Sequence, residues 1–243
     1  MLHYVRQGSG KTLVLIHGFL GGSDVFKAMI DDLSLHFDVL AVDLPGHGQS
    51  DVAVSAYTIE AYADAIVDVL KAEDIEKAIW LGHSMGGYIV LSALANEIFE
   101  IPKAILLHSA VNADGEEAIE KRTKQQQDIK RDGVESFVEH VIPNFLSPKS
   151  SPNLTKKAKD VANQASIEGL VAALEAMKGR TARQSFIDET STPILVIEGT
   201  EDKVVPSIET NNSAITKVKV DSGHLGMIED LDGVLQAIYG FLK

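Results

Sequence analysis

The sequence predicts an α/β fold, with a mostly parallel β-sheet covered by helices on both faces and with an inserted α-helical unit. Two features of the 243-residue chain support this prediction. Short apolar runs alternate with amphipathic segments in the first part of the chain, which favours parallel strands joined by helices. Between residues 108 and 193 this alternation stops, and helical segments follow one another. We therefore expect a core formed by residues 1–110 and 181–243, and an inserted unit over residues 111–180.

The elements of the core are expected in the following order. Strands are predicted where apolar or β-branched residues form short runs, at Leu2–Arg6, Thr12–Ile16, Asp38–Val42, Ala78–Leu81, Ala104–Leu107, Pro193–Gly199 and Lys217–Val220. A tight turn at Gly8-Ser9-Gly10 is expected to join the first two strands as a hairpin. Helices are predicted at Ser23–Leu35, Thr58–Ala72, Gly87–Ala95 and Ser207–Ile215, with Thr58 as an N-cap.

The inserted unit is expected to contain helices alone. Gly133 and the loop 147–153, which is rich in serine and proline, divide it into segments. The helices are predicted at Asp114–Arg131, Val134–Phe145, Leu154–Ser166 and Ile167–Lys178.

The pentapeptide Gly82-His83-Ser84-Met85-Gly86 lies between an expected strand and an expected helix. Glycines at its first and last positions permit a sharp strand-to-helix turn, because side chains there would clash with neighbouring chain. Such a turn holds the central serine in a strained backbone conformation, typical of a nucleophile. The pentapeptide also arises by chance, so its interpretation depends on an acid and a histidine at the ends of later strands.

A carboxylate and a histidine do follow in that order. Asp202 comes just after the strand that ends at Gly199, and His224 follows the last expected strand. The carboxyl ends of parallel strands meet at one edge of a sheet, so Ser84, Asp202 and His224 are expected to lie together there. A serine hydroxyl needs a base to remove its proton during attack, and the base needs an acid to orient it. These three residues are the predicted catalytic residues.

With two further motifs, this arrangement resembles the α/β-hydrolase fold superfamily over nearly the whole chain. The motifs are His17-Gly18-Phe19 and Asp43-Leu44-Pro45-Gly46-His47-Gly48-Gln49-Ser50, each after a predicted strand. The resemblance implies that the backbone N–H groups of Phe19 and Met85 form an oxyanion hole. It also implies that the inserted helices form a lid that shapes the acyl pocket. Some members place the acid after an earlier strand, which makes Asp114 the alternative to Asp202.

The resemblance implies a serine hydrolase that cleaves small or medium soluble carboxylic esters through an acyl-enzyme. Serine at position 84 excludes the aspartate chemistry of haloalkane dehalogenases and epoxide hydrolases, and leaves serine esterases, lactonases and carbon–carbon hydrolases as the similar groups. The alternatives are a menaquinone-pathway-like lyase, a carbon–carbon bond hydrolase and a ligand sensor with slow turnover. His83, Leu20 and Tyr88 are expected to line the substrate pocket. The run Lys121–Gln127 is interpreted as a solvated lid face, or alternatively as an attractor of anionic substrates.

The composition limits the classes of partner that the chain is expected to bind. The formal net charge of −13 argues against nucleic acid and anionic membranes as partners, because phosphate binding needs clustered basic residues. The chain has no cysteine and no metal-ligand spacing, so no metal and no cofactor are expected. A start without signal-peptide character and the lack of a long apolar run predict a cytoplasmic protein whose partner is a small ester or related acyl substrate. The other histidines are expected to lie outside the proton relay, where they form structural hydrogen bonds, line the pocket, pack in the core or lie at the surface. They are His3, His17, His36, His47, His83, His108 and His140.

Overall fold

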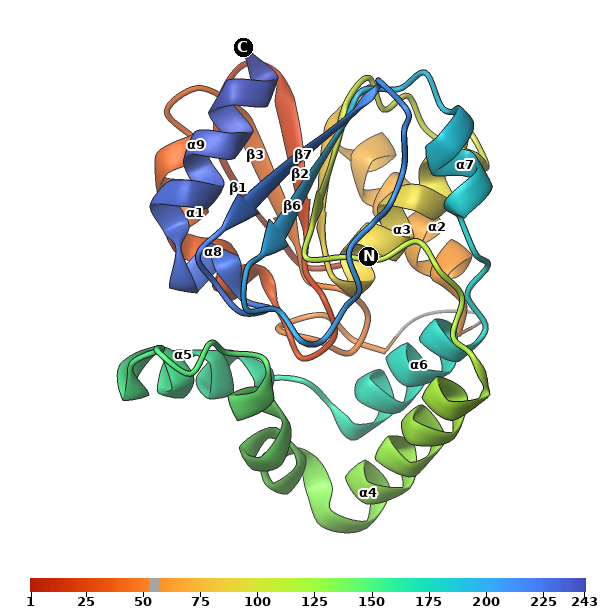
Figure 1. Ribbon diagram of the computed structural model, residues 1–243, viewed down its shortest axis with the longest axis vertical. Coiled ribbons are helices and arrows are strands. Elements are labelled where there is room, and N and C mark those ends of the chain that lie inside the picture. Colours follow the sequence, from red (N-terminus) through yellow and green to blue (C-terminus); the bar gives the residue numbers. More distant parts are fainter. Residues whose placement is uncertain (53–56) are drawn as a thin grey trace.

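The computed structural model describes residues 1–52 and 57–243, which are built around one seven-stranded sheet (Figure 1). The strand order is β1-β3-β2-β4-β5-β6-β7, and every neighbouring pair is parallel except β1 and β3. The prediction of a mostly parallel sheet is therefore confirmed. The strands are β1 (Tyr4–Gly8), β2 (Thr12–Ile16), β3 (Asp38–Val42), β4 (Ile79–His83), β5 (Ala104–Leu107), β6 (Ile194–Gly199) and β7 (Ile215–Val220).

The predicted hairpin between the first two strands is wrong, because β3 lies between them. Val42 of β3 is in register with Tyr4 of β1 on one side and with Ile16 of β2 on the other. Burial explains this order. All five residues of β3 are buried, as suits an inner strand, whereas β1 is mostly exposed and occupies the edge. The turn after β1, with positive φ at Gly8 and Gly10, carries the chain past β3 instead of folding it back.

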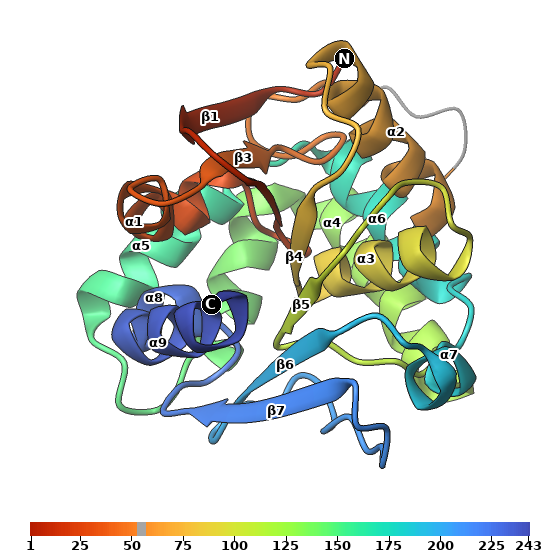
Figure 2. The same ribbon diagram turned by 90° about the horizontal axis from the view of Figure 1, so that it is seen from above.

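Helices cover both faces of the sheet, as predicted (Figure 2). One face carries α1 (Lys27–Leu33), preceded by a 3₁₀ turn at Ser23–Phe26, together with α8 (Gly226–Glu229) and α9 (Leu231–Leu242). The other face carries α2 (Ile59–Ala72), α3 (Met85–Ala95) and α7 (Gln184–Glu189). The hydroxyl oxygen of Thr58 accepts a hydrogen bond from the Ala61 amide at 3.1 Å, so Thr58 is the predicted N-cap of α2.

The helix predicted at Ser207–Ile215 is absent, because residues 207–214 form a loop and Ile215 begins β7. Local side-chain hydrogen bonds compete with the helical ladder there. The Asn212 amide N–H donates to Thr210 Oγ1 at 3.2 Å, and the Ala214 amide donates to Asn212 Oδ1 at 3.0 Å. The Asn212 side chain also donates to the Ile187 carbonyl, which ties the loop to α7.

The segment between β5 and β6 adds a separate group of helices at one end of the sheet (Figure 1). These are α4 (Glu116–Val141), a 3₁₀ turn at Ile142–Asn144, α5 (Pro152–Ala162) and α6 (Ile167–Lys178). Gly133 has a φ of 81° and interrupts α4, at the position where the sequence divides two helices. Among the helices of the described residues, none combines the length and the apolar character that a membrane crossing requires.

Candidate active site

Ser84 lies at the junction between β4 and α3, in a backbone conformation that side chains rarely adopt. Its φ is 51° and its ψ is −115°. Hydrogen bonds hold this conformation, because the Ser84 amide donates to the Leu107 carbonyl at 2.9 Å and Ser109 Oγ donates to the Ser84 carbonyl at 2.8 Å. In this conformation the hydroxyl faces the loop that follows β7.

Two glycines make this sharp turn possible. A Cβ atom on Gly82 would lie 2.2 Å from the carbonyl oxygen of Gly86, and a Cβ atom on Gly86 would lie 2.2 Å from the carbonyl oxygen of Ile16. Both distances are far below van der Waals contact, so only glycine fits at either position. The physical reason given for the pentapeptide from the sequence therefore applies in the folded chain.

His224 and Asp202 lie next to the Ser84 hydroxyl, although the three residues come from different loops. His224 Nε2 is 2.9 Å from Ser84 Oγ, and His224 Nδ1 is 2.9 Å from Asp202 Oδ2. The His224 side chain is 1% exposed and that of Asp202 is 5% exposed. The His224 amide donates to the Phe145 carbonyl at 2.7 Å, which fixes the backbone that carries the imidazole. A hydroxyl, an imidazole and a carboxylate are thus in hydrogen-bonding order.

Asp202 carries a negative charge in this buried place because it accepts two hydrogen bonds and lies beside a second imidazole. Burial raises the pKa of its carboxyl, but the imidazoles of His108 and His224 and the amide of Val204 outweigh burial and hold the pKa well below its usual range. The Val204 amide donates to Asp202 Oδ1 at 2.8 Å. The carboxylate is therefore available to orient the His224 ring at any moderate pH.

His108 belongs to this site and was not singled out for it from the sequence. Its Nδ1 lies 3.3 Å from Asp202 Oδ2, without the geometry of a full hydrogen bond, and its side chain is fully buried. Burial lowers the pKa of the His108 imidazole. The place of His108 in the sequence could have indicated this role. It directly follows β5, so it lies at the same sheet edge as the loops after β4 and β6.

The loop after β2 packs directly against the turn that carries Ser84. A Cβ atom on Gly18 would lie 2.9 Å from Ser84 Cβ, so a larger residue would displace the nucleophile. His17 holds this loop, because its Nε2 accepts from the Leu44 amide at 2.9 Å and its Nδ1 donates to the Gly18 carbonyl at 2.7 Å. Phe19 follows Gly18, and Met85 is the first residue of α3, where an amide N–H is free of the helical ladder.

A cavity of about 420 Å³ adjoins this arrangement. Phe19, Tyr88 and Phe145 line it, and the Phe145 ring lies 5.2 Å from the His224 ring. His83 and Leu20, the other predicted pocket residues, are buried and are not among the residues that line this cavity. His83 Nε2 donates to the His224 carbonyl at 2.8 Å, so this ring supports the loop of His224.

The alternative acid, Asp114, also lines this cavity but has other partners. It forms ion pairs with Arg122 and with Arg180, the latter at 2.6 Å. Burial raises the pKa of the Asp114 carboxyl, and the two guanidinium groups outweigh burial, so the pKa is lowered. Within residues 1–52 and 57–243, no cluster of histidine, aspartate or glutamate side chains is arranged to hold a metal ion.

Replacing the buried His47 by glutamine is expected to reduce the loss of stability in acid. Burial, and next the neighbouring His17, lowers the pKa of His47 to about 3, below the value of about 6.5 expected in an unfolded chain. Between these values the unfolded state binds a proton that the folded state does not. The free energy of unfolding therefore falls as the pH falls below 6.5, by at most about 1.4 kcal/mol per pH unit for this group.

Urea unfolding at pH 7.5 and pH 5 measures this effect. The His47→Gln protein should lose less free energy of unfolding between the two pH values than the wild type. His36→Gln is the matched control, because His36 is exposed, and it should lose as much as the wild type. Equal losses in all three proteins would contradict the prediction.

Comparisons with known proteins agree with this fold. Residues 11–231 match the model of a family described as alpha/beta hydrolase fold. A dihydrolipoyllysine-residue acetyltransferase component of the acetoin cleaving system from Cupriavidus necator is 27% identical, over 94% of this chain and 63% of that protein. The chain thus spans less than two thirds of the length of the first curated relatives that it matches.

Two esterases are also similar. A pimeloyl-[acyl-carrier protein] methyl ester esterase from Xylella fastidiosa is 29% identical, over 82% of this chain and 79% of that protein. The structure of a thermophilic esterase from Thermogutta terrifontis superposes with a TM-score of 0.91 at 27% identity, over 99% of this chain and 92% of that one.

Proposed function

The chain belongs to the alpha/beta hydrolase fold family, and from this premise we propose that it is a serine hydrolase that cleaves small or medium carboxylic esters through an acyl-enzyme. The family and the esterases among the similar proteins support an enzyme of the hydrolase class. The finer proposal, a serine nucleophile acting on carboxylic esters, depends on the residues around Ser84.

The observation that carries the proposal is the pair of 2.9 Å contacts that His224 makes with Ser84 Oγ and Asp202 Oδ2. The contact with the carboxylate favours the imidazole tautomer with the proton on Nδ1, which leaves the Nε2 lone pair facing the hydroxyl. In this tautomer His224 can accept the Ser84 proton as the oxygen attacks a carbonyl carbon. Asp202 then stabilises the imidazolium that forms, because it is already ionised.

The tetrahedral intermediate places a negative charge on the former carbonyl oxygen. The proposed donors to this oxygen are the backbone N–H groups of Phe19 and Met85. Each such donor lowers the barrier by about 3 kcal/mol in enzymes where it has been removed. The Met85 donor lies at the N-terminus of α3, so the helix dipole adds to its effect. Collapse of the intermediate breaks the ester bond, and His224 returns the proton to the leaving alcohol.

Water completes the reaction. It attacks the acyl carbon, His224 removes its proton, and the second tetrahedral intermediate collapses to release the carboxylic acid and the Ser84 hydroxyl.

We assign residues 111–180 as a lid over the site where this step takes place. Two contacts support that role: the Phe137 ring lies edge-on to Phe19 at 6.2 Å, and the Phe145 ring lies edge-on to the His224 ring at 5.2 Å. We propose that both aromatic rings limit the access of bulk water to His224, whose side chain is 1% exposed.

An activity panel tests the reaction class. Purified protein is assayed with p-nitrophenyl esters of graded acyl length, together with a lactone, a thioester and a substrate for carbon–carbon cleavage. We expect ester cleavage with a preference for short or medium acyl chains, and no carbon–carbon scission. Scission without ester cleavage would favour the carbon–carbon hydrolase or lyase alternatives. Tight binding with a turnover of hours would favour the ligand sensor.

A further inference from the structure

We propose that the cavity next to Ser84 binds a carboxylate carried by the acyl group, so that the preferred esters are monoesters of dicarboxylic acids or similarly anionic esters. This inference rests on the proposed function and specifies its substrate class. It follows from three features of the described residues: an excess of positive charge in the cavity, a buried arginine at its wall, and apolar surfaces beside these charges.

The cavity concentrates cations in a strongly acidic chain. Lys121, Arg122 and Arg180 line it, and Asp114 is the one acidic residue among the residues that line it. The formal charge of these four side chains is therefore +2, whereas the whole chain carries −13. Because acidic residues outnumber basic ones in this chain, a group of lining residues with a net positive charge differs from the chain as a whole. A local excess of positive charge inside a cavity favours an anionic ligand.

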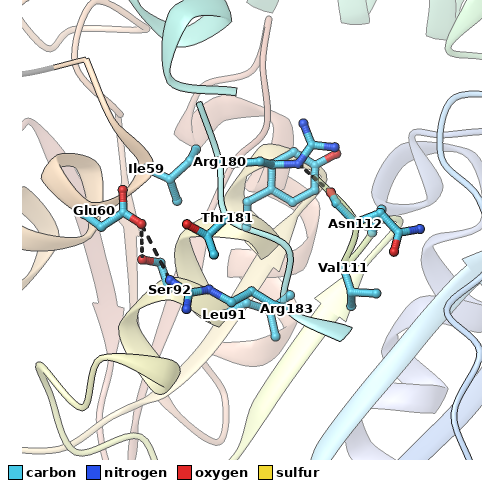
Figure 3. Close-up of a pocket in the computed structure, with 11 residues that line it drawn as sticks. Ile59, Glu60, Leu91, Ser92, Val111, Asn112, Arg180, Thr181 and Arg183 are labelled. Carbon is cyan, nitrogen blue, oxygen red and sulfur yellow. Dashed lines mark hydrogen bonds and ion pairs between the residues drawn. The ribbon is translucent and has the colours of Figure 1, made fainter. Parts of the chain in front are cut away.

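Arg180 is the residue that points most clearly to a ligand. Its side chain is only 9% exposed, and its guanidinium lies 4.3 Å above the Tyr88 ring. Its Nε donates to the Asn112 carbonyl at 2.9 Å, and its Nη1 donates to Asp114 and to the Met177 carbonyl. A dashed line marks the contact with Asn112 in Figure 3, a close-up of a second pocket that shares Arg180 and Asn112 with this cavity. Nη2 has no hydrogen-bond partner among the described residues and is not one of their buried unpartnered atoms, so it remains open to solvent or to a ligand. A mostly buried guanidinium with one accessible N–H group is suited to a charge-assisted hydrogen bond with an anionic ligand.

Arg122 has a similar free donor. Its Nε and Nη2 both donate to Asp114, and within the described part of the chain its Nη1 has no partner. One carboxylate therefore holds two guanidinium groups and neutralises only one of them. Asp114 places the two arginines on one wall of the cavity, and a second carboxylate, from the substrate, would balance their charge.

A purely structural role for Arg122 and Arg180 explains less of the charge arrangement in the cavity. Arg122 lies on α4 and Arg180 follows α6, so their shared contact with Asp114 also braces the start and the end of the inserted helices. A brace needs only one arginine for one carboxylate. It does not require Lys121 at the same cavity, and it leaves the net charge of +2 on the cavity's side chains without a counterion.

The remaining walls suit an alkyl chain that ends in a charge. Val204, Val205, Pro206 and Phe145 line the same cavity as the arginines. Methylene groups would pack on these side chains, while a terminal carboxylate reaches the guanidinium groups. The acyl part is retained on the enzyme until water attacks, whereas the alcohol leaves first. A fixed contact to a buried cation therefore suits the acyl part.

A matched pair of substrates tests the inference. Mono-p-nitrophenyl adipate and p-nitrophenyl hexanoate have acyl chains of equal length and differ in one terminal carboxylate. We expect the wild type to show a higher kcat/KM for the charged ester, and the ratio of the two values to fall about tenfold or more in Arg122→Gln, because a charge-assisted hydrogen bond is lost. Arg122→Lys retains the charge and should recover part of the ratio. Lys130→Gln is the matched control, because it removes an exposed charge from the same helix, away from the cavity.

A binding measurement separates this inference from the proposed reaction. Calorimetric titration with adipate should detect binding to the wild type and binding about tenfold weaker in Arg122→Gln, whether or not an ester is cleaved. A charged-to-neutral ratio of one in a wild type that cleaves the hexanoate ester would overturn the inference and leave the serine hydrolase intact. A ratio or an adipate affinity that is unchanged in Arg122→Gln, or no adipate binding at all, would also overturn it. Adipate binding without cleavage of either ester would instead count against the proposed reaction alone.

Discussion

Ser84→Ala is expected to lower kcat for p-nitrophenyl butyrate by about 10⁶-fold, to the limit of detection. The substitution removes the oxygen that lies 2.9 Å from His224 Nε2, so no acyl-enzyme can form. Initial rates measured at several enzyme concentrations give this value, with the wild type assayed in parallel. A phosphonate probe should add its mass to the wild-type protein once, at Ser84, and should leave the variant unmodified.

The fold should survive this substitution, because the methyl group of alanine takes the place of the serine Cβ and the turn is held by backbone groups. The melting temperature of Ser84→Ala is expected to stay close to that of the wild type. Ser92→Ala is the matched control, because Ser92 lies on the same helix and contacts Glu60 instead of His224. This control should keep its activity and should still react with the phosphonate. Undiminished turnover in a folded Ser84→Ala protein would remove Ser84 from the mechanism.

The sequence predicts the mostly parallel sheet well, because buried parallel strands have a simple signature. β3 and β5 are short apolar runs that are buried throughout, and helices with one apolar stripe separate such runs. The proximity of Ser84, Asp202 and His224 could be expected for the same reason. Each follows a parallel strand, and the carboxyl ends of these strands share one edge of the sheet.

Features that depend on contacts between distant segments could not be predicted in this way. The order β1-β3-β2 depends on which strands are buried on both sides. The short turn after β1 instead indicated a hairpin between β1 and β2. His108 acquires its place beside Asp202 only because β5 and β6 are neighbours in the sheet. Asp114 and Arg180 are 66 residues apart in the chain, so no local pattern relates them.

The loop at residues 207–214 illustrates a different limit. Its composition allows a helix, but Asn and Thr side chains form hydrogen bonds with the backbone two residues away and stabilise a non-helical chain. The choice between the two depends on partners outside the segment, such as the Ile187 carbonyl that accepts from Asn212. Propensity alone does not contain this information.

Asp202→Asn is expected to lower kcat by about 10⁴-fold with little change in KM. The carboxylate accepts a hydrogen bond from His224 Nδ1 at 2.9 Å, which keeps the proton on that nitrogen. An asparagine at this position can donate to Nδ1 and favour the opposite tautomer, in which Nε2 carries the proton and cannot accept one from Ser84. Asparagine has nearly the same shape as aspartate and keeps the packing. A loss of kcat of this size would therefore result from the wrong tautomer of His224 and not from a change in the fold.

Asp114→Asn distinguishes the two candidate acids under the same assay. Because Asp114 pairs with Arg122 and Arg180, its replacement should change kcat for a neutral ester by less than about tenfold, since the His224 tautomer is unaffected. Steady-state rates with p-nitrophenyl butyrate, and melting temperatures for both variants, provide the comparison. A loss of only a few-fold in Asp202→Asn, together with a loss of several thousandfold in a folded Asp114→Asn protein, would transfer the role of the acid to Asp114. The direct contact of Asp202 with His224, which Asp114 lacks among the described residues, predicts the opposite order.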